Sequence, residues 1–323
     1  MLLLGATGTI GRATCDALLA RGHQVVALVR PGSVAELPQG TVRRHVDVSD
    51  PVAVARDGFG AALPDDASAP RFDAVVSCMA SRSGEPRDAW EVDHRAHMNV
   101  LHAAKAAGVR QFVLLSAICV QKPRLPFQQA KLAFERALRE SGLVWSIVRP
   151  TAFFKSLSGQ IERVRAGRSF LVFGDGRLTA CKPISDRDLA DFIVGCLDDP
   201  ARQNATLPIG GPGPALTPLE QGGLLFDALG QAPRIRHVPV ALVGGIAATL
   251  GVLGVVSGRL RAKAELARIG HYYATESMLL LDPATGRYDA AATPEHGQDT
   301  LADHYAQLIR DGTSVDLGAH SVF

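Results

Sequence analysis

Seven residues close to the N-terminus, Gly5–Gly11 (GATGTIG), limit what this chain can fold into more than any other stretch. They follow a short apolar run, Leu2–Leu4, and open a segment with the apolar period of a helix. Glycines let the backbone turn sharply and let a pyrophosphate approach the main chain, while the helix N-terminus attracts negative charge. Strand, turn and helix in this order predict a nucleotide site, with an ordinary strand–helix turn as the alternative. The residues expected to bind are Gly5, Thr7, Gly8, Thr9, Ile10 and Gly11.

Apolar runs of strand length alternate with helical patterns through the first 150 residues. The runs are Leu2–Leu4, Gln24–Val29, Val42–Val46, Ala74–Cys78, Gln111–Leu115 and Trp145–Val148. The helical patterns are Thr9–Arg21, Pro51–Asp57, Arg87–Ala107 and Pro126–Ser141. This alternation predicts an α/β fold of the Rossmann type, a doubly wound parallel sheet whose ligands bind outside the carboxyl ends of the strands.

The pattern loosens after residue 150, and a smaller substrate-binding region is expected over residues 151–323. Two segments with capping-box spacing predict helices over 185–197 and 217–229 that pack back on the 1–150 core. Asp282–Tyr288 resembles a hairpin turn, and Asp299 is expected to cap a last helix.

Composition restricts the classes of partner. The 323 residues are 47% hydrophobic and carry a net charge of +2, which argues against a nucleic-acid-binding surface. Five scattered cysteines without a CxxC pair fit a reducing, cytoplasmic compartment and no metal cluster. Leu2–Leu4 is too short for the apolar part of a signal peptide.

One segment, Val238–Val256, holds nineteen residues without a charge, close to the length of a membrane-spanning helix. Pro239 and several glycines interrupt it, which favours a buried helix or a helix lying on a greasy ligand or a membrane surface. A transmembrane helix is the minor alternative. We therefore expect a cytoplasmic protein, with peripheral attachment to a membrane as a second possibility.

Arg30 ends the second expected strand, nineteen positions after Gly11. Folds that prefer NAD place a carboxylate near this point to accept a hydrogen bond from the ribose 2′-hydroxyl. An arginine suits the 2′-phosphate of NADP because its fork binds a dianion bidentately. Arg30 therefore predicts NADPH as the cofactor, and an exposed strand-end arginine without a ligand is the alternative.

Further cofactor contacts are expected from topology. Asp47 and Val48 follow the third strand, where a carboxylate can accept from the adenine amino group. Ala80, within Met79–Ser81, follows the fourth strand, where small residues let the backbone pass the nicotinamide ribose. Each segment is equally consistent with a plain loop.

Ser116, at the end of the fifth strand, and Lys131 form the next expected pair. Helical spacing puts Lys131 on one face with Phe127, Ala130, Phe134 and Leu138, as the single charge of an apolar stripe. Such a lysine either extends to solvent or meets a specific acceptor, and an NADP ribose would serve.

These motifs, with Val92–Asp93 and Asn99–Ala104, resemble the extended and atypical short-chain dehydrogenase/reductases. That family carries a Tyr-x-x-x-Lys pair in which the tyrosine donates a proton, whereas this chain has Phe127 at the tyrosine position. Phenylalanine cannot donate a proton, which argues against the usual alcohol–ketone chemistry. The resemblance implies reduction of a carbon–carbon double bond with Lys131 as the catalytic residue.

Longer blocks, spread over both halves, resemble the divinyl chlorophyllide 8-vinyl reductase family. They are 116–121 (SAICVQ), 127–132, 147–159, 182–190, 207–214, 273–282, 299–305 and 320–323. The resemblance implies NADPH-dependent reduction of the 8-vinyl group of a magnesium tetrapyrrole to ethyl, in chlorophyll or bacteriochlorophyll biosynthesis. It also implies a site in which Pro150, Thr151 and Phe153, just past the sixth strand, lie near the nicotinamide; packing between the two regions is the alternative.

The implied substrate, divinyl chlorophyllide or protochlorophyllide, is large, flat and apolar with a central magnesium ion. His94, His97 and His271 are candidate magnesium ligands, and none is singled out by the sequence. Two other functions stay open: a tyrosine-less reductase of the isoflavone-reductase type acting on small aromatics, and a regulator or assembly factor that binds NADP(H) without turnover. The oligomeric state does not follow from the sequence.

Overall fold

The computed structural model describes residues 1–60, 72–242, 244–245 and 258–312, and of residues 258–262 only the backbone. The chain forms two compact units. The first comprises Met1–Ser81, Pro86–Arg149 and Leu189–Leu207, and the second comprises Arg82–Glu85, Pro150–Asp188 and Pro208–Phe323. The segment Leu189–Leu207 therefore packs with the first unit although it follows residue 150 in the chain.

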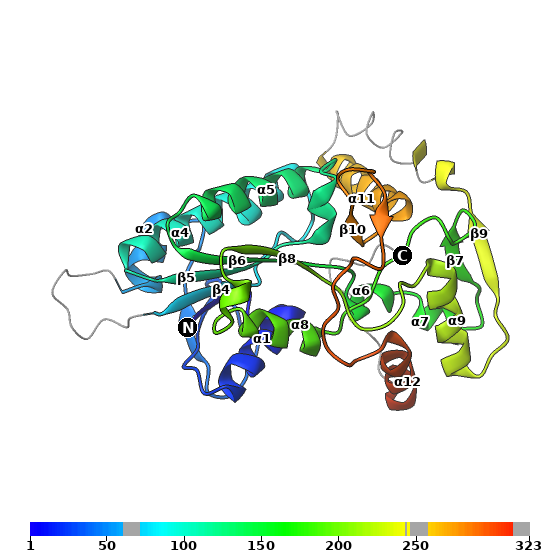
Figure 1. The fold of residues 1–323 in the computed structure, drawn as a ribbon, viewed down its shortest axis with the longest axis horizontal. Helices are drawn as coiled ribbons and strands as arrows, with labels where there is room; N and C mark the ends of the chain where they lie inside the picture. Colours follow the sequence, from blue (N-terminus) through cyan, green and yellow to red (C-terminus); the bar gives the residue numbers. More distant parts are fainter. Residues whose placement is uncertain (61–71, 243, 246–257, 313–323) are drawn as a thin grey trace. The chain divides into compact units, whose positions relative to one another are not determined.

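A seven-stranded sheet with the order β3-β2-β1-β4-β5-β6-β8 forms the centre of the first unit (Figure 1). Its strands are β1 Leu2–Leu4, β2 Val26–Val29, β3 Val42–His45, β4 Ala74–Ser77, β5 Gln111–Leu115, β6 Val144–Pro150 and β8 Ala205–Ile209. The pairs from β3 through β6 are all parallel. The chain order reverses between β1 and β4, which is the point where doubly wound sheets bind dinucleotides. The predicted α/β fold class is confirmed.

Helices cover both faces of this sheet. In Figure 1, α4 and α5 lie on one face, and α1 and α8 lie on the other. The helical segments are α1 Thr9–Ala20, α2 Pro51–Ala53, η1 Val54–Gly58, α3 Pro86–Ala89, η2 Trp90–Ala96, α4 His97–Ala106, η3 Ile118–Gln121, α5 Pro126–Arg139, α8 Asp186–Gly195 and η4 Pro200–Arg202. The helix expected over Arg87–Ala107 is present, but its middle, η2, is a wider π-helical stretch.

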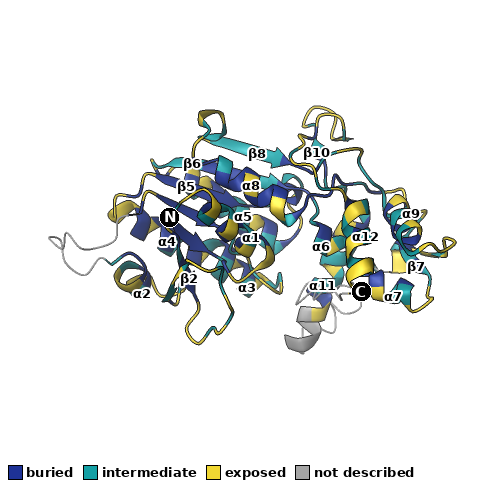
Figure 2. Ribbon diagram, turned by 90° about the horizontal axis from the view of Figure 1, so that it is seen from below, coloured by how far each residue is buried: buried dark blue, intermediate teal, exposed yellow. Residues whose placement is uncertain are grey.

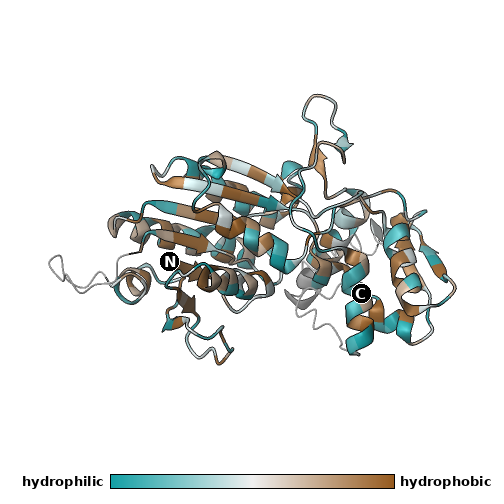
Figure 3. Ribbon diagram, turned by 60° about the horizontal axis from the view of Figure 1, so that its bottom comes forward, coloured by the Kyte–Doolittle hydropathy of each residue, from teal (hydrophilic) through white to brown (hydrophobic). Residues whose placement is uncertain are grey.

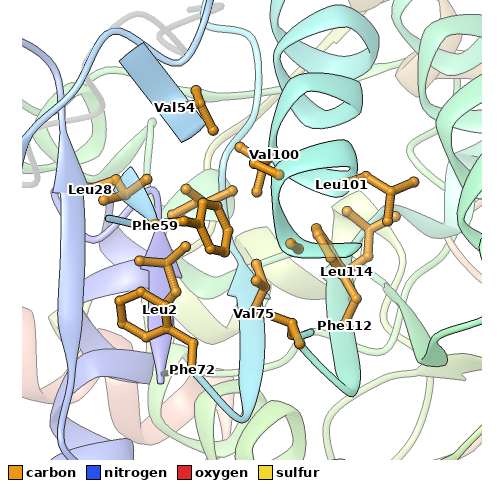
Figure 4. Close-up of a cluster of buried hydrophobic side chains, with 14 of the residues drawn as sticks. Leu2, Leu28, Val54, Phe59, Phe72, Val75, Val100, Leu101, Phe112 and Leu114 are labelled. Atoms are coloured by element: carbon orange, nitrogen blue, oxygen red, sulfur yellow. The ribbon is translucent and has the colours of Figure 1, made fainter. Parts of the chain in front are cut away.

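One hydrophobic core of the first unit lies between the sheet and helices α4 and α5. Figure 4 shows Val75 and Phe112 from the strands meeting Val100 and Leu101 from α4. The central strands, such as β5, are dark blue in Figure 2 because they are buried, whereas the edge strands β3 and β8 are only partly buried. Brown apolar residues predominate along the central strands in Figure 3. A sheet buried on both faces requires the continuous apolar runs that the sequence shows.

The second unit has its own core and its own short sheets. Its elements are α6 Phe154–Leu157, α7 Ile161–Arg165, β7 Phe170–Phe173, α9 Pro218–Leu229, β9 Ile235–Val238, α11 Gly258–Thr275, β10 Leu280–Leu281, β11 Tyr288–Asp289 and α12 Leu301–Asp311. Parallel strands β7 and β9 pair, α12 packs against α9, and Phe226 and Tyr305 are fully buried in this core. Strands β10 and β11 form the hairpin expected at 282–288.

The capping signals were predicted with mixed success. Thr217 and Glu220 form the expected reciprocal capping box of α9. Ser185 caps α8 through the amide of Asp188, but the Asp188 carboxylate accepts from the amides of Gln298 and Asp299 instead of completing the box. Thr300, and not Asp299, caps α12, because the Asp299 carboxylate binds Ser185 and Arg187.

The uncharged segment Val238–Val256 lies mostly outside the described residues. Within the part of the chain that the structure describes, no helix is long and apolar enough to cross a membrane.

Candidate active site

The glycine turn joins β1 to α1 as expected, and its three glycines have different structural roles. Gly5 has φ +77°, and a Cβ there would lie 2.6 Å from the backbone of Cys78 in the neighbouring strand end. A Cβ on Gly11 would overlap the carbonyl oxygen of Gly5. Gly8 is exposed, and its Cβ would meet only the Gly5 carbonyl, at 3.4 Å. Gly5 and Gly11 are thus required for close packing of the backbone within the turn. Gly8 instead leaves space on the exposed side of the turn.

The open side of the turn suits a phosphate. Thr7, Gly8 and Thr9 are exposed, and Gly8 occupies the cap position of α1, where it offers no side chain to the first-turn amides. Ile10 is buried and anchors the helix on the core. Exposed amides at a helix N-terminus bind anions through hydrogen bonds and the helix dipole.

Arg30 lies exposed directly after β2, and its guanidinium has no hydrogen bond or ion pair with any residue that the structure describes. Its neighbours are occupied in building the following loop. Arg12 donates to the Glu36 carbonyl at 2.6 Å, and Arg43 donates to the carbonyls of Ser33 and Ala35. Arg30 is therefore the arginine of this group that a ligand can recruit without breaking a contact.

The loop after β3 is fixed from two sides. The Asp47 carboxylate accepts from the amide and hydroxyl of Ser49, and these hydrogen bonds hold the pKa of Asp47 below its usual value. The Asn99 amide of α4 donates to the carbonyls of Val48 and Ser49, each at 3.1 Å. Asp47 stays exposed, which keeps it accessible to an adenine amino group.

Lys131 meets a carboxylate of its own unit. Its ammonium lies 3.0 Å from Oδ1 of Asp93, and the two side chains are 12% and 0% exposed. Asp93 also accepts from Ser81, at 2.6 Å from the hydroxyl and 3.2 Å from the amide. One buried carboxylate thus joins Lys131 to the loop that contains Ala80. Asp93 was not among the predicted site residues, although a buried lysine requires an anionic partner.

Ser116 is engaged by a different carboxylate. Its hydroxyl donates to Glu135 at 2.7 Å, and Glu135 also receives Arg149 and Arg139. Burial of Glu135 raises its pKa, but the hydrogen bonds from Arg149 and Ser116 and the arginine charges outweigh that effect, so the pKa lies below its usual value. Helix α5 therefore buries a second charged residue, Glu135, outside the apolar stripe on which Lys131 was predicted. The spacing of four residues between Lys131 and Glu135 was the available signal.

Pro150, Thr151 and Phe153 belong to the second unit, where the backbone after β6 pairs with 182–184. Thr151 is 2% exposed, and its hydroxyl donates to the Lys182 carbonyl. Phe153 forms a backbone bridge with Ile184 and is only partly buried. The Thr151 side chain therefore has a structural partner within the second unit. Their place near a nicotinamide stays a prediction.

The three candidate histidines differ in their surroundings. His97 is buried, and both ring nitrogens are occupied, one by the Ser77 hydroxyl and one by the Val92 carbonyl, at 2.8 Å each. His94 is partly buried, with its ring 5.4 Å from that of Trp90; burial and then the Arg95 charge lower its pKa. His271 lies in α11 of the second unit. No group of three or more His, Cys, Asp or Glu side chains in the described ranges could hold a metal ion.

His97 predicts an acid-sensitive fold. Burial, with smaller effects of nearby charges, lowers its pKa from 6.5 to about 4. The unfolded chain then binds the proton first, so stability falls as pH drops from about 6.5 towards 4, by about 3 kcal/mol in total. Between about pH 7.5 and about pH 5, Tm should fall less in His97→Gln, whose amide can replace both hydrogen bonds, than in the parent protein. Equal losses of Tm in the two proteins would contradict this origin.

Comparison with known proteins places these features in a family context. Residues 5–200 match a protein family described as NAD(P)H-binding. The chain is 47% identical over 331 residues to divinyl chlorophyllide a 8-vinyl-reductase, chloroplastic, of Oryza sativa subsp. indica, an alignment covering 100% of this chain and 82% of that protein. The protein of the same name from Arabidopsis thaliana is 44% identical, with 97% of this chain and 77% of the relative covered.

Among solved structures, the NADPH complex of an NADPH-dependent quinone oxidoreductase from Escherichia coli shares the fold. Its TM-score is 0.67 at 20% identity, and the match covers 95% of this chain and 99% of that one. The family match includes the glycine turn and Lys131, so the nicotinamide cofactor expected from the sequence is confirmed.

Proposed function

Because the chain belongs to the divinyl chlorophyllide a 8-vinyl-reductase family, we propose that it reduces the 8-vinyl group of divinyl chlorophyllide or protochlorophyllide to ethyl with NADPH. The observation that carries this proposal is 44–47% identity to four such reductases over nearly the whole chain. The substrate is accordingly a magnesium tetrapyrrole of chlorophyll or bacteriochlorophyll biosynthesis.

The glycine turn, Arg30 and the loop around Asp47 and Val48 hold the cofactor in this proposal. The amides of the first turn of α1 bind the pyrophosphate at the glycine turn, and Arg30 binds the 2′-phosphate. When bound, NADPH supplies the hydride. The protein's main task is then to hold the donor and acceptor carbons about 3–3.5 Å apart and to exclude water.

Lys131 holds the nicotinamide ribose and adds positive potential where negative charge develops on the substrate. Its bond to Asp93 fixes the ammonium and, through Ser81, the loop containing Ala80. Phe127 stands at the start of α5, four residues before Lys131, and cannot supply the proton that completes the reaction. This absence agrees with a conjugated vinyl acceptor, which delocalises the charge after hydride delivery.

Two other functions make different predictions. A reductase of small aromatics would turn over substrates without a macrocycle, and a regulator would bind NADPH without oxidising it in the presence of any tetrapyrrole. The presence of both Lys131 and its buried partner Asp93 favours an enzyme, because a purely structural ion pair can be replaced by apolar residues without loss of stability.

The direct test is incubation of the purified protein with NADPH and divinyl chlorophyllide or divinyl protochlorophyllide. We expect the absorption maxima of the pigment to move to shorter wavelength as NADPH is consumed, with one NADPH oxidised per vinyl group lost. No turnover of either pigment, with NADPH binding intact, would reject the reductase and favour the regulator.

Arg30 sets the preference between the two nicotinamide cofactors. Arg30→Ala should raise KM for NADPH on the order of 10- to 100-fold, because a charge-assisted bond to the 2′-phosphate is lost. The KM for NADH should barely change. Arg110→Ala, which removes an exposed arginine of the same unit, serves as control and should leave both values unchanged. Equal increases for the two cofactors in Arg30→Ala would show that this side chain does not read the 2′-phosphate.

We also propose that the protein works in the cytoplasm with peripheral attachment to the photosynthetic membrane. The apolar composition of 238–256 and the apolar product both support this placement. Flotation with anionic vesicles should recover the protein, and deletion of 242–256 should abolish flotation. Recovery without vesicles, or unchanged flotation of the deletion variant, would contradict it.

A further inference from the structure

An indole and an imidazole stand together on η2, the helical segment that also carries Asp93, the partner of Lys131. Trp90 and His94 lie one turn apart on η2, with ring centroids 5.4 Å apart and planes crossing at 67°. Asp93, the residue before His94, binds Lys131. All of these residues belong to the first unit. π-helical stretches such as η2 are rare and occur frequently at functional sites.

Neither the indole of Trp90 nor the imidazole of His94 has an evident role in stabilising the fold. Trp90 is 40% exposed, although an indole contributes much to a core when it is buried. The ring nitrogens of His94 make no hydrogen bond to any described residue, although the ring is partly buried. His97 on the next turn shows the contrasting case, since protein groups occupy both of its nitrogens.

The substrate class of the proposed function can interact with both the indole and the imidazole. A magnesium tetrapyrrole presents a flat apolar face and a metal ion that takes a further ligand perpendicular to that face. A neutral imidazole nitrogen is such a ligand. An imidazole that ligates a metal stands upright on the macrocycle, so an indole that crosses it at 67° can lie nearly flat against the same face.

We propose that His94 ligates the central magnesium of the tetrapyrrole and that Trp90 packs against the macrocycle beside it. This inference rests on the proposed function and names the subsite that holds its substrate. The ligated metal would fix the position of the macrocycle at η2, the segment that also carries Asp93, the partner of Lys131. His94 is thus a positioning residue for the substrate, and Lys131 acts next to the reacting carbons.

Binding without turnover tests the subsite. The protein is titrated, in the absence of NADPH, with divinyl protochlorophyllide and with the same pigment from which magnesium has been removed. The parent protein should bind the magnesium form about tenfold or more tightly. His94→Ala should lose this preference while its affinity for the metal-free pigment is unchanged, and added imidazole should restore the preference. Trp90→Ala should lower the affinity for both pigments by the same factor.

Controls separate the different ways in which this test can fail. His102→Ala removes an exposed histidine of α4 and should keep the metal preference. NADPH affinity, measured on every variant, shows that the fold is intact. If His94→Ala keeps the preference for magnesium, the ligand assignment is wrong even where the parent protein reduces the vinyl group. If the parent protein binds neither pigment and reduces none, the proposed function itself fails.

Discussion

Lys131→Ala is expected to lower kcat for vinyl reduction on the order of 10²–10³-fold, the usual effect of removing one preorganised charge from the site where negative charge develops. The KM for NADPH should rise less, because the pyrophosphate and 2′-phosphate contacts remain. Steady-state kinetics with both substrates varied gives the two parameters separately. An unchanged kcat would show that Lys131 contributes only to the fold.

The substitution has a structural side effect that must be separated from catalysis. Removal of the lysine leaves the carboxylate of Asp93 buried without its cation, and breaking a buried pair in this way costs about 3–5 kcal/mol of stability. The double variant Lys131→Ala/Asp93→Asn removes both charges, and the amide oxygen that replaces the carboxylate would still accept from Ser81. It should recover most of the lost Tm while kcat stays low. Recovery of kcat together with Tm would mean that the single variant was merely unstable.

A second matched variant tests the role of Asp93 by itself. Asp93→Asn keeps the size of the side chain and an acceptor for the Ser81 hydroxyl but removes the charge that holds Lys131. We expect kcat to fall by a smaller factor than in Lys131→Ala, because the ammonium remains but is less well placed. Lys105→Ala, which removes an exposed lysine of α4, should change neither kcat nor Tm.

The sequence predicted local features well where a single physical cause determines them. The buried strands of the sheet read as apolar runs, and β1 and β5 have the predicted bounds. The capping box of Thr217 and Glu220 depends on neighbouring residues alone and was correct. Where capping residues have partners distant in the chain, as Asp188 and Asp299 do, the local rule was incomplete.

The charged partners inside the first unit were missed for the same reason. Asp93 and Lys131 are 38 residues apart, and nothing in the spacing pairs them. Glu135 was within reach of a sequence argument, since it lies one turn after Lys131, but its burial depends on Arg149 from β6. Periodicity indicates which face of a helix is buried, and it cannot indicate which charges are neutralised there.

The glycine turn allows protein packing to be separated from ligand binding. Gly8→Ala should leave the Tm of the cofactor-free protein unchanged, because the new Cβ would meet only the Gly5 carbonyl at 3.4 Å. It should weaken NADPH binding about tenfold or more if the pyrophosphate approaches at this point. Calorimetric titration with NADPH measures the loss, and unchanged affinity would place the pyrophosphate elsewhere.

Gly11→Ala should behave in the opposite way. Its Cβ would overlap the Gly5 carbonyl, so the turn must shift, at a cost of about 1–3 kcal/mol that lowers Tm even without cofactor. NADPH affinity should fall as a consequence of the displaced amides. Gly223→Ala in α9, where a Cβ has open space, is the control and should raise stability by about 0.5–1 kcal/mol without affecting NADPH. Together the three variants distinguish the glycines that the backbone requires from the one that the cofactor requires, because only Gly8→Ala loses affinity at unchanged Tm.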